Sequence, residues 1–430
     1  MTYTQDSTAS RLEPSSPLQI ADFRRFWFSR FASWFATSGM VVIIGYQLYD
    51  LARQSYGMSI KEASLMLGVL GFVQFVPMFL LTPVAGVVAD RFDRRKVGGL
   101  AVAVDGLIAL VLALATSMHA LSLPLLLGLG VAHGATKVFI GPAVGAIAPM
   151  IVPAPLLPRA IAMNSMAMQA GTIIGPAAAG LLFGWYAPSF YAMAAGLLGL
   201  SVFNLQRIRP LPAHAANKEA HPFRLLADGF RFVRGNPFLL GCITLDLFAV
   251  LLGGATALLP VYARDILHVG ATGLGQMRAA PAIGAAVVGL VLSWKPLRRN
   301  VGVVMLGSVV LFGLATAGFG ISRNYTLSLV LLAVLGGADM VSMFVRGSLI
   351  QLHTPNSMRG RVQAISGLAI GASNELGEME SGLAATLLGA TGAVVFGGLG
   401  AVAVTLLWAV LFPSIRKAKS FDVKQDEANA

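Results

Sequence analysis

Apolar residues dominate the chain in a series of long runs, and short polar segments rich in basic side chains separate these runs. Most runs hold about 20 residues, the length that an α-helix needs to cross the hydrocarbon core of a bilayer. The alternating polar and apolar decads of a transmembrane strand barrel are absent from the sequence. We therefore expect membrane-spanning helices at twelve ranges: 27–50, 63–89, 97–118, 121–150, 160–184, 186–206, 237–263, 272–294, 301–321, 325–352, 361–388 and 391–413.

Composition supports a membrane location for these helices. Of the 430 residues, 56% are hydrophobic and 12% are charged, whereas a soluble domain carries about 25% charged residues. So few polar side chains could not cover the surface of a water-soluble globule of this size. The fold class we expect is an all-α polytopic membrane protein with twelve transmembrane helices, and its main partner is the lipid bilayer.

The formal net charge of +12 could indicate a nucleic-acid partner, but the distribution of charge along the chain argues against one. If the runs cross the membrane alternately, 24 of the 31 Lys and Arg residues fall on the side that holds both ends of the chain. Five fall on the other side, and Lys137 and Arg346 lie inside runs. Because basic segments mark the cytoplasmic side of membrane proteins, we expect both termini in the cytoplasm and no nucleic-acid partner.

Sequence features of enzymes and metalloproteins are missing. Cys242 is the single cysteine, which excludes an intramolecular disulfide and a cysteine-based metal cluster. The sequence has no phosphate loop G-x-x-x-x-G-K, no nucleophile elbow G-x-S-x-G, and no His pair with a carboxylate at a metal-binding spacing. We expect no metal, no cofactor and no enzymatic activity.

One polar segment, residues 207–235, is much longer than the others. Its Pro, Ala and His content is typical of a linker, and its last part has the pattern of a short amphipathic helix at the membrane interface. The first 22 residues lack the basic start and the cleavage site of a signal peptide. We expect five parts: a cytoplasmic N-tail at 1–22, a six-helix bundle at 23–206, a cytoplasmic linker at 207–235, a second six-helix bundle at 236–413 and a cytoplasmic C-tail at 414–430.

Two loops of the first half have counterparts in the second half. The segment "DRRKV" (93–97) matches "LRRNV" (297–301) at an offset of 204 residues. The segment "VPAPLLPRAIAMNS" (152–165) matches "TPNSMRGRVQAISG" (354–367) at an offset of 202 residues. Two independent loops with nearly the same offset indicate an internal duplication, and in transporters built from parallel repeats the substrate site lies near the bilayer midplane between the repeats.

The stretch "GVVADRFDRR" (86–95) resembles the loop signature of the major facilitator superfamily, G-x-x-x-D-R-x-G-R-R/K, between helices two and three. Asp93 replaces the usual glycine, a departure common in the transmembrane secretion-effector branch. The resemblance implies a cytoplasmic latch in which Asp90 meets the positive N-terminal end of helix eleven, near Arg361. A simpler interpretation is that these charges only set the topology. The matching residues are Gly86, Asp90, Arg91, Arg94 and Arg95.

The expected fifth helix carries "GTIIGPAAAG" (171–180), which resembles the antiporter motif G-x-x-x-G-P-x-x-G-G of proton-driven exporters in this superfamily. Small residues four apart give a face for close helix packing, and proline bends the helix. Generic glycine packing is the alternative, because the chain has 48 glycines. The matching residues are Gly171, Gly175, Pro176 and Gly180, while Ala179 stands for one glycine.

The segments 141–165 and 351–368, and the order of elements over residues 20–412, resemble the enterobactin-exporter-like branch of the superfamily. This branch includes siderophore exporters and proteins assigned to drug efflux. The resemblance implies a monomer in the bacterial cytoplasmic (inner) membrane that exports a small molecule and takes its energy from a proton gradient. It also implies that helices one, four, seven and ten line the central cavity.

An ionisable side chain inside a span costs several kcal/mol unless it is paired or hydrated, so each is a functional candidate. Three of them, Lys137, Asp339 and Glu375, lie about 20 Å from the cytoplasmic ends of their helices and could share one site. Asp105 is about two turns from Arg95, which favours a role in the latch region. The eight candidates are Asp105, Lys137, Asp246, Asp339, Arg346, Glu375, Glu378 and Glu380.

Lys137 is the expected counter-charge for an anionic cargo or for an acid across the cavity, and a permanent structural salt bridge is the alternative. His133 lies one turn away on the same helix face and could relay protons, or it could simply be hydrogen-bonded. The other candidates for contact with cargo or counter-ion are Asp246 and Arg346, the latter two turns from Asp339 on one face.

Glu375 and Glu378 are three residues apart and share a helix face, whereas Glu380 points elsewhere. Two carboxylates this close repel each other when both are ionised, so one of them should hold a proton easily. Asp339, Glu375 and Glu378 are therefore the proton-coupling candidates. Alternatively, one Glu pairs with Arg346 and another caps a helix break at Gly377. Together these residues favour a proton-coupled exporter working by alternating access over an uncoupled facilitator or importer.

Overall fold

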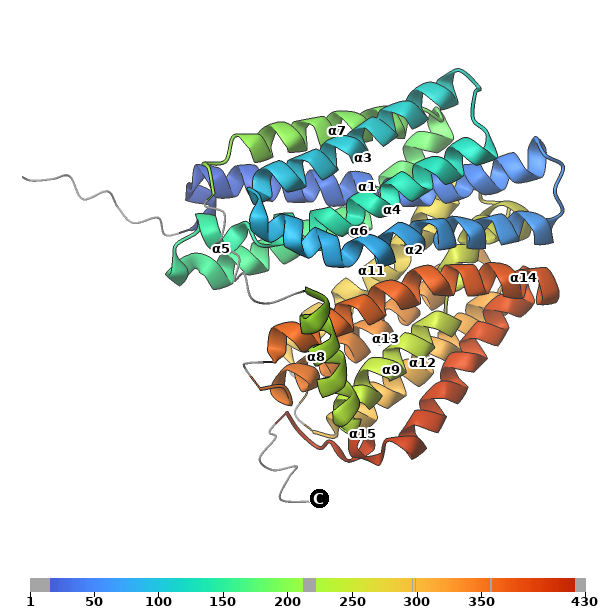
Figure 1. Ribbon diagram of the computed structural model, residues 1–430. Helices are drawn as coiled ribbons and strands as arrows, with labels where there is room; N and C mark the ends of the chain where they lie inside the picture. Colours follow the sequence, from blue (N-terminus) through green and yellow to red (C-terminus); the bar gives the residue numbers. More distant parts are fainter. Residues whose placement is uncertain (1–15, 212–221, 296, 298, 356–357, 422–430) are drawn as a thin grey trace, which may run out of the picture.

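The computed structural model describes residues 16–211, 222–295, 297, 299–355 and 358–421, and within these ranges it is helical without strands (Figure 1). The elements are η1 (Pro17–Gln19), α1 (Ala21–Gln54), α2 (Ile60–Arg91), α3 (Arg94–Ser117), α4 (Leu123–Gly145), α5 (Ala148–Ile151), η2 (Ala154–Leu156), α6 (Leu157–Trp185), α7 (Ser189–Gln206), α8 (Pro222–Gly235), α9 (Pro237–Leu252), η3 (Ala255–Leu258), α10 (Leu259–Val261), the π-helix η4 (Tyr262–Ile266), α11 (Gly270–Trp294), α12 (Val301–Ile321), α13 (Tyr325–Leu352), α14 (Arg359–Leu411) and α15 (Pro413–Lys417). Residues 1–15, 212–221 and 422–430 of the expected tails and linker lie outside the described ranges.

Eleven helical segments in the described part are long and apolar enough to cross a bilayer. One of them, α14, has 53 residues, which at 1.5 Å per residue is about 80 Å and enough for two crossings. Gly389 interrupts it with a φ of 74°, a backbone conformation that glycine adopts without strain. Figure 1 shows two limbs of α14 that run in opposite directions, so the described helices supply the twelve expected crossings.

Local sequence explains where several helices begin. Ser59 and Glu62 form a reciprocal capping box at the start of α2, which satisfies two backbone N–H groups that the helix itself cannot pair. Asn236 and Asn324 accept backbone N–H groups at the starts of α9 and α13. Asp93 does the same for α3. Each of these residues ends a polar loop and sets the point at which the chain enters an apolar run.

The crossings form two groups that follow the two halves of the chain (Figure 1). In the first half, α1 packs against α6 and α7, and α3 packs against α4 and α7. In the second half, α11 packs against α13, and α14 packs against α9 and α12. Helix α8 lies against α14, where Gly229 meets the backbone of Arg361. The predicted short helix of the linker is therefore present, and it contacts the second half.

The two halves touch at one end of the molecule and diverge at the other (Figure 1). We call the end that holds η1 and α15 the terminal side and the other end the opposite side. Toward the opposite side, Gly68 of α2 packs on Gly382 of α14, and Gly180 of α6 packs on Gly275 of α11. Toward the terminal side, Gly86 of α2 has open space around it. The structure is thus closed on the opposite side.

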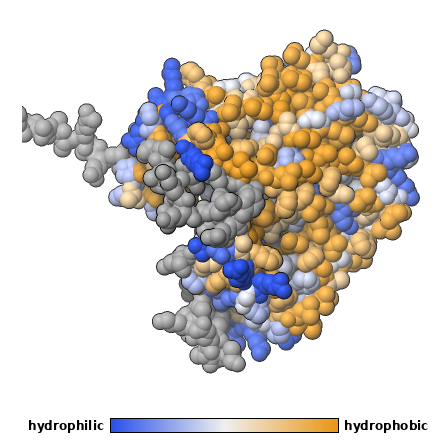
Figure 2. Space-filling view, in the orientation of Figure 1, coloured by the Kyte–Doolittle hydropathy of each residue, from blue (hydrophilic) through white to orange (hydrophobic). Residues whose placement is uncertain are grey.

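The outer surface matches a protein that lies within a bilayer. Figure 2 shows apolar residues over the middle of the helices and hydrophilic residues gathered toward the two ends. Large apolar side chains such as Leu107, Leu181 and Val410 are exposed on the outer faces of α3, α6 and α14. Because lipid tails are as apolar as these side chains, their exposure needs no protein partner.

Candidate functional site

Four charged side chains from three helices meet between the two halves, and we call them the interface cluster: Lys137, Arg278, Glu375 and Glu378. The Lys137 Nζ atom of α4 lies 3.7 Å from Glu375 Oε1 of α14. The Arg278 Nη2 atom of α11 lies 3.9 Å from Glu378 Oε1. The first pair joins the two halves of the molecule, and the second lies one helical turn further along α14.

Arg278 and Glu378 also line a narrow cavity of about 40 Å³ between the halves. Gln74 of α2 lines it, and so do apolar side chains from α1, α2, α10 and α11. Arg278 donates a hydrogen bond to the carbonyl of Thr256 at 3.0 Å. Thr256 lies in η3, after the regular helix α9 has ended. A space of this size with several polar groups can hold water.

Small residues bring the carboxylates of α14 to the interface. A side chain at Gly68 or Gly71 of α2 would collide with the α14 backbone near Gly382 and Glu375. The absence of side chains at these positions lets the two helices cross at close range. The Glu378 side chain therefore lies directly against α2, where the first half covers it.

Near Lys137, the first half encloses three polar side chains that are hydrogen-bonded to one another. We call them the polar triad: Asp105, His133 and Thr136. His133 Nδ1 lies 2.7 Å from Asp105 Oδ1, and neither side chain has exposed surface. Thr136 donates to the same carboxylate oxygen at 2.9 Å. The expectation that Asp105 serves the latch region is therefore wrong, because its partners His133 and Thr136 lie on α4, four residues and one residue before Lys137.

Asp246 and Arg346 form a separate ion pair inside the second half. Asp246 lies on α9 and Arg346 on α13, and both side chains are buried. The alternative in which a glutamate pairs with Arg346 is wrong, since Asp246 occupies that position. Asp339 lies two turns away on α13, within electrostatic range of this pair. The structure thus brings Lys137 and Glu375 together but places Asp339 with the pair in the second half.

Glu380 points away from the interface cluster, as the helical periodicity predicts. It lies in a groove of about 410 Å³ whose other lining side chains are apolar and belong to the two limbs of α14. Gly377 is helical and packs on the carbonyls of Val250 and Leu251. The helix break expected at Gly377 lies instead at Gly389.

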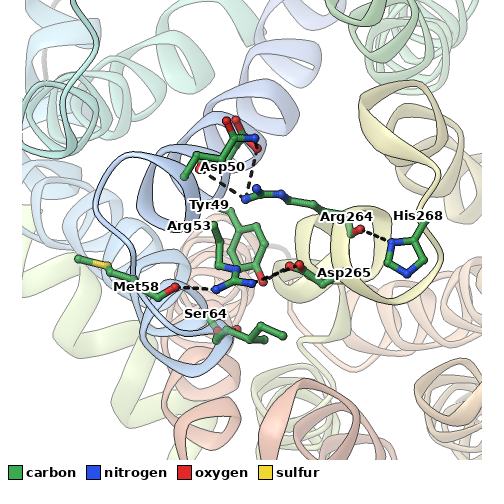
Figure 3. Close-up of polar contacts among 10 residues, drawn as sticks. Tyr49, Asp50, Arg53, Met58, Ser64, Arg264, Asp265 and His268 are labelled. Atoms are coloured by element: carbon green, nitrogen blue, oxygen red, sulfur yellow. Dashed lines mark hydrogen bonds and ion pairs between the residues drawn. The ribbon is translucent and has the colours of Figure 1, made fainter.

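On the opposite side, five charged or polar side chains connect the halves, and we call them the opposite-side cluster: Tyr49, Asp50, Arg53, Arg264 and Asp265 (Figure 3). Tyr49 donates to Asp265 at 2.5 Å, and Arg53 lies 3.6 Å from the same carboxylate. Arg264 lies 3.2 Å from Asp50. All three contacts run from the end of α1 to the π-helix η4, so they hold the opposite side shut.

The loop signature between α2 and α3 makes its described contacts within the first half. Arg95 donates to Asp93 and to the carbonyl of Ile208, and Arg94 donates to the carbonyl of Ala89 at 3.3 Å. The exposed Arg91 lies at the end of α2. No atom lies within contact distance of the position that a side chain at Gly86 would take.

The latch expected between Asp90 and the N-terminal end of helix eleven lies partly outside the described residues. The side chain of Asp90, the residue assigned to the end of helix eleven, lies outside what the structure describes. Arg361, at that helix end, lies 3.9 Å from Asp228 of α8. Burial raises the pKa of Asp93 and hydrogen bonds from Arg95 lower it, and the net result is a pKa below the ordinary value. Asp93 therefore stays ionised and keeps Arg95 in the first half.

Helix α6 carries the second signature, and its glycines make the close contacts that the spacing predicts. Gly171 and Gly175 lie against the backbone of α1 at Phe35. Gly180 faces Gly275 of α11 in the other half. Pro176 lies inside α6, next to this crossing. The signature therefore joins α6 to a helix of its own half and to a helix of the other half.

Sequence reasoning missed Arg278 and misplaced Asp105. Arg278 is one of the five basic residues assigned to the non-cytoplasmic side, although it lies inside the expected span 272–294. Asp105 was assigned to the latch on its distance along one helix. The signal that could have found its partners was the H-x-x-T spacing of His133 and Thr136, which places both side chains on one helix face.

Comparisons with known proteins give one family. The sequence profile of the Major Facilitator Superfamily matches residues 26–377. An "Enterobactin exporter EntS" from Citrobacter koseri is 28% identical over 402 residues, which are 92% of this chain and 92% of that protein. The protein of the same name from Shigella boydii is 28% identical over 386 residues, with 88% and 90% covered.

Solved structures agree on the fold. A bacterial homolog of the human lysosomal transporter Spinster, in an inward-facing and unoccupied conformation, has a TM-score of 0.69 at 14% identity and covers 94% of this chain and 97% of its own. The nucleoside transporter NupG has a TM-score of 0.70 at 15% identity, with 93% and 99% covered. At such identities these structures support the fold alone.

Proposed function

The chain belongs to the Major Facilitator Superfamily, and from this premise we propose that it is a proton-coupled exporter of a small amphipathic or anionic molecule. Family membership makes it a multi-pass membrane transporter rather than an enzyme. We place it in the bacterial inner membrane with both termini in the cytoplasm. The terminal side is then the inner side, and the conformation described here opens inward.

The observation that carries the proposal is the ion pair between Lys137 and Glu375 across the two halves, with Glu378 one turn away. A proton that arrives on Glu375 removes the negative charge that holds Lys137. Loss of the proton restores the pair. Glu375 is protonated from outside and deprotonated inside, and cargo binds in alternation with the proton, so the two move in opposite directions.

The names of the relatives suggest the cargo class. Both curated relatives are exporters of enterobactin, and we propose a siderophore-like molecule or an amphipathic drug for this chain. The Lys137 ammonium group between the two halves suits an acidic group on the cargo. Export rather than import follows from the resemblance of α6 to the antiporter signature.

The cargo can be identified by comparing the metabolites retained by a deletion strain with those of its parent, with and without iron limitation. The retained compound is then loaded into proteoliposomes that contain the purified protein under an imposed pH gradient. We expect Glu375→Gln and Glu378→Gln to abolish pH-driven transport, with binding of the compound largely kept. Glu380→Gln is the matched control, because this carboxylate on the same helix faces the apolar groove.

Two results would contradict proton-coupled export by these residues. If pH-driven transport survives every single and double substitution among Asp339, Glu375 and Glu378, these residues do not couple protons to cargo. Equilibration of the compound in both directions without any effect of the gradient would identify an uncoupled facilitator instead.

A further inference from the structure

The polar triad contains a histidine whose hydrogen bonding is incomplete. His133 is fully enclosed, and its Nδ1 atom contacts Asp105 at 2.7 Å. Its Nε2 atom is buried as well, and no hydrogen-bond partner for this atom is present among the described residues. A buried polar atom without a hydrogen-bond partner costs roughly 1–3 kcal/mol, so its presence in a folded protein needs a physical explanation.

Few groups interact with the Asp105–His133 pair. Asp105 lies on α3, and the groups that interact with it are His133, Thr136 and Lys137 from α4 and Thr37 from α1. Thr136 and Thr37 donate hydrogen bonds and carry no charge. Two cationic groups can therefore balance the Asp105 carboxylate, the His133 imidazolium in direct contact and the Lys137 ammonium one turn away.

Lys137 is in direct contact with only one of its two neighbouring carboxylates and acts on Asp105 at longer range. In this structure it pairs with Glu375 of the other half. A fully buried carboxylate without a counter-charge is very costly. While Lys137 is held by Glu375, the Asp105 carboxylate therefore requires the proton on His133. When that proton leaves, Lys137 becomes the remaining cation that can compensate Asp105.

We propose that the Asp105–His133 pair is a positioning device that decides, by the protonation of His133, whether Lys137 binds across to Glu375 or turns back to Asp105. The inference rests on the proposed function and deepens it. His133 does not touch the cargo and acts through Lys137. Protonated His133 stabilises the ion pair between the halves and so favours the conformation that opens on the terminal side. Deprotonated His133 draws Lys137 away, which weakens this conformation.

The test needs no cargo. Spin labels on cysteines at Lys96 and Gln351, both exposed and on the terminal side of the two halves, report the separation of the halves in nanodiscs. Cys242 is enclosed in the second-half core and stays in place. Protonation of Glu375 acts in the opposite direction, because it releases Lys137. Between about pH 8 and about pH 5, where histidine titrates, a dominant effect of His133 predicts that the ratio of open to closed distances in the wild-type protein rises about tenfold.

His133→Gln and Asp105→Asn should each remove this pH response, because each eliminates the exchange of Lys137 between two carboxylates. The matched control is His119→Asn in the exposed turn after α3, where the positive φ of His119 also suits asparagine. The control should respond like the wild type. Histidine NMR of the wild-type protein gives a second measurement that needs no folded variant, and it should show one histidine titrating together with the distance change.

The outcomes separate this inference from the proposed function. If His133→Gln and Asp105→Asn are folded and keep the wild-type pH midpoint while Glu375→Gln loses the response, the positioning device is refuted and proton coupling stands. If the wild-type protein shows no pH response at all, both proposals fail. A lower thermal stability in the variants with an unchanged midpoint would assign the pair a structural role and also refute the inference.

Discussion

At the scale of single residues, several buried charges in the described part of the chain are stabilised by direct contact with an opposite charge. Asp246 and Arg346 illustrate it inside the second half, where both side chains are buried and in contact. Removal of one member of a buried pair leaves an uncompensated charge, whereas replacement of both members by apolar groups is close to neutral.

We therefore expect Asp246→Asn to lower the free energy of unfolding by about 3–5 kcal/mol. The double variant with Asp246→Leu and Arg346→Met should recover most of the loss. Thermal unfolding in detergent, followed by size-exclusion chromatography, measures both effects. Arg231→Gln is the control, since its contact with Asp228 is exposed and worth well under about 1 kcal/mol. Equal losses in the control and in Asp246→Asn would contradict this reasoning.

The residues of the site were predictable as a list but not as pairs. A charged residue inside an apolar run is visible in the sequence, which is why Lys137, Glu375 and Glu378 were identified. Their partners depend on which helices are neighbours, and a linear sequence does not contain that information. Asp105 was misassigned for this reason, because its distance from Arg95 along α3 is unrelated to its contact with His133 on α4.

At the scale of elements, close contact between helices depends on glycine at both sides of a crossing. Gly180 of α6 and Gly275 of α11 meet at the boundary between the halves, so near that a side chain on either would collide with the other helix. In membranes such contacts supply van der Waals packing in place of a hydrophobic driving force.

Gly180→Val should therefore weaken the closed opposite side, at a cost of about 1–3 kcal/mol from overpacking. Spin labels on cysteines at Ala120 and Thr326, exposed residues on that side of the two halves, should report longer distances in the variant. Gly196→Val on the outer face of α7 is the control, because nothing lies within contact distance of that glycine. An unchanged distance distribution in Gly180→Val would show that the Gly180–Gly275 contact does not keep the opposite side closed.

Element existence was predictable with few exceptions. Each of the twelve apolar runs contains a helix in the described residues, because a chain in hydrocarbon must satisfy its backbone within each segment. Two details escaped prediction. The expected seventh span becomes irregular between Gly253 and Tyr262, and the expected eleventh and twelfth spans join as limbs of α14 at Gly389. The first depends on contacts with neighbouring helices, because Gly253 and Gly254 meet α12 and α14.

At the scale of the whole molecule, the opposite-side cluster and the glycine crossings act together to hold the halves in one arrangement. Tyr49, Arg53 and Asp265 make two of the contacts across the boundary, and Arg264 and Asp50 make the third (Figure 3). The charged side chains are partly exposed, so each ion pair contributes modestly and is weakened by salt.

Asp265→Asn should accordingly raise the population that is open on the opposite side by roughly fivefold, which corresponds to about 1 kcal/mol. The label pair at Ala120 and Thr326 measures this population in nanodiscs. High salt should produce a smaller change of the same sign in the wild-type protein and little further change in the variant. A variant that stays closed to the wild-type extent would show that the glycine crossings alone hold this side shut.

The linear order of residues is enough to predict that this chain crosses a membrane twelve times, in two related halves, and which side chains carry charge into the bilayer. Those properties follow from hydropathy, from the spacing of motifs and from an internal duplication, all of which are linear. Only the tertiary structure decided which charges neutralise each other and on which side the halves meet. The physical reason is that an ion pair depends on distances of a few ångströms between helices far apart in the chain, and these distances arise from the packing of every helix at once.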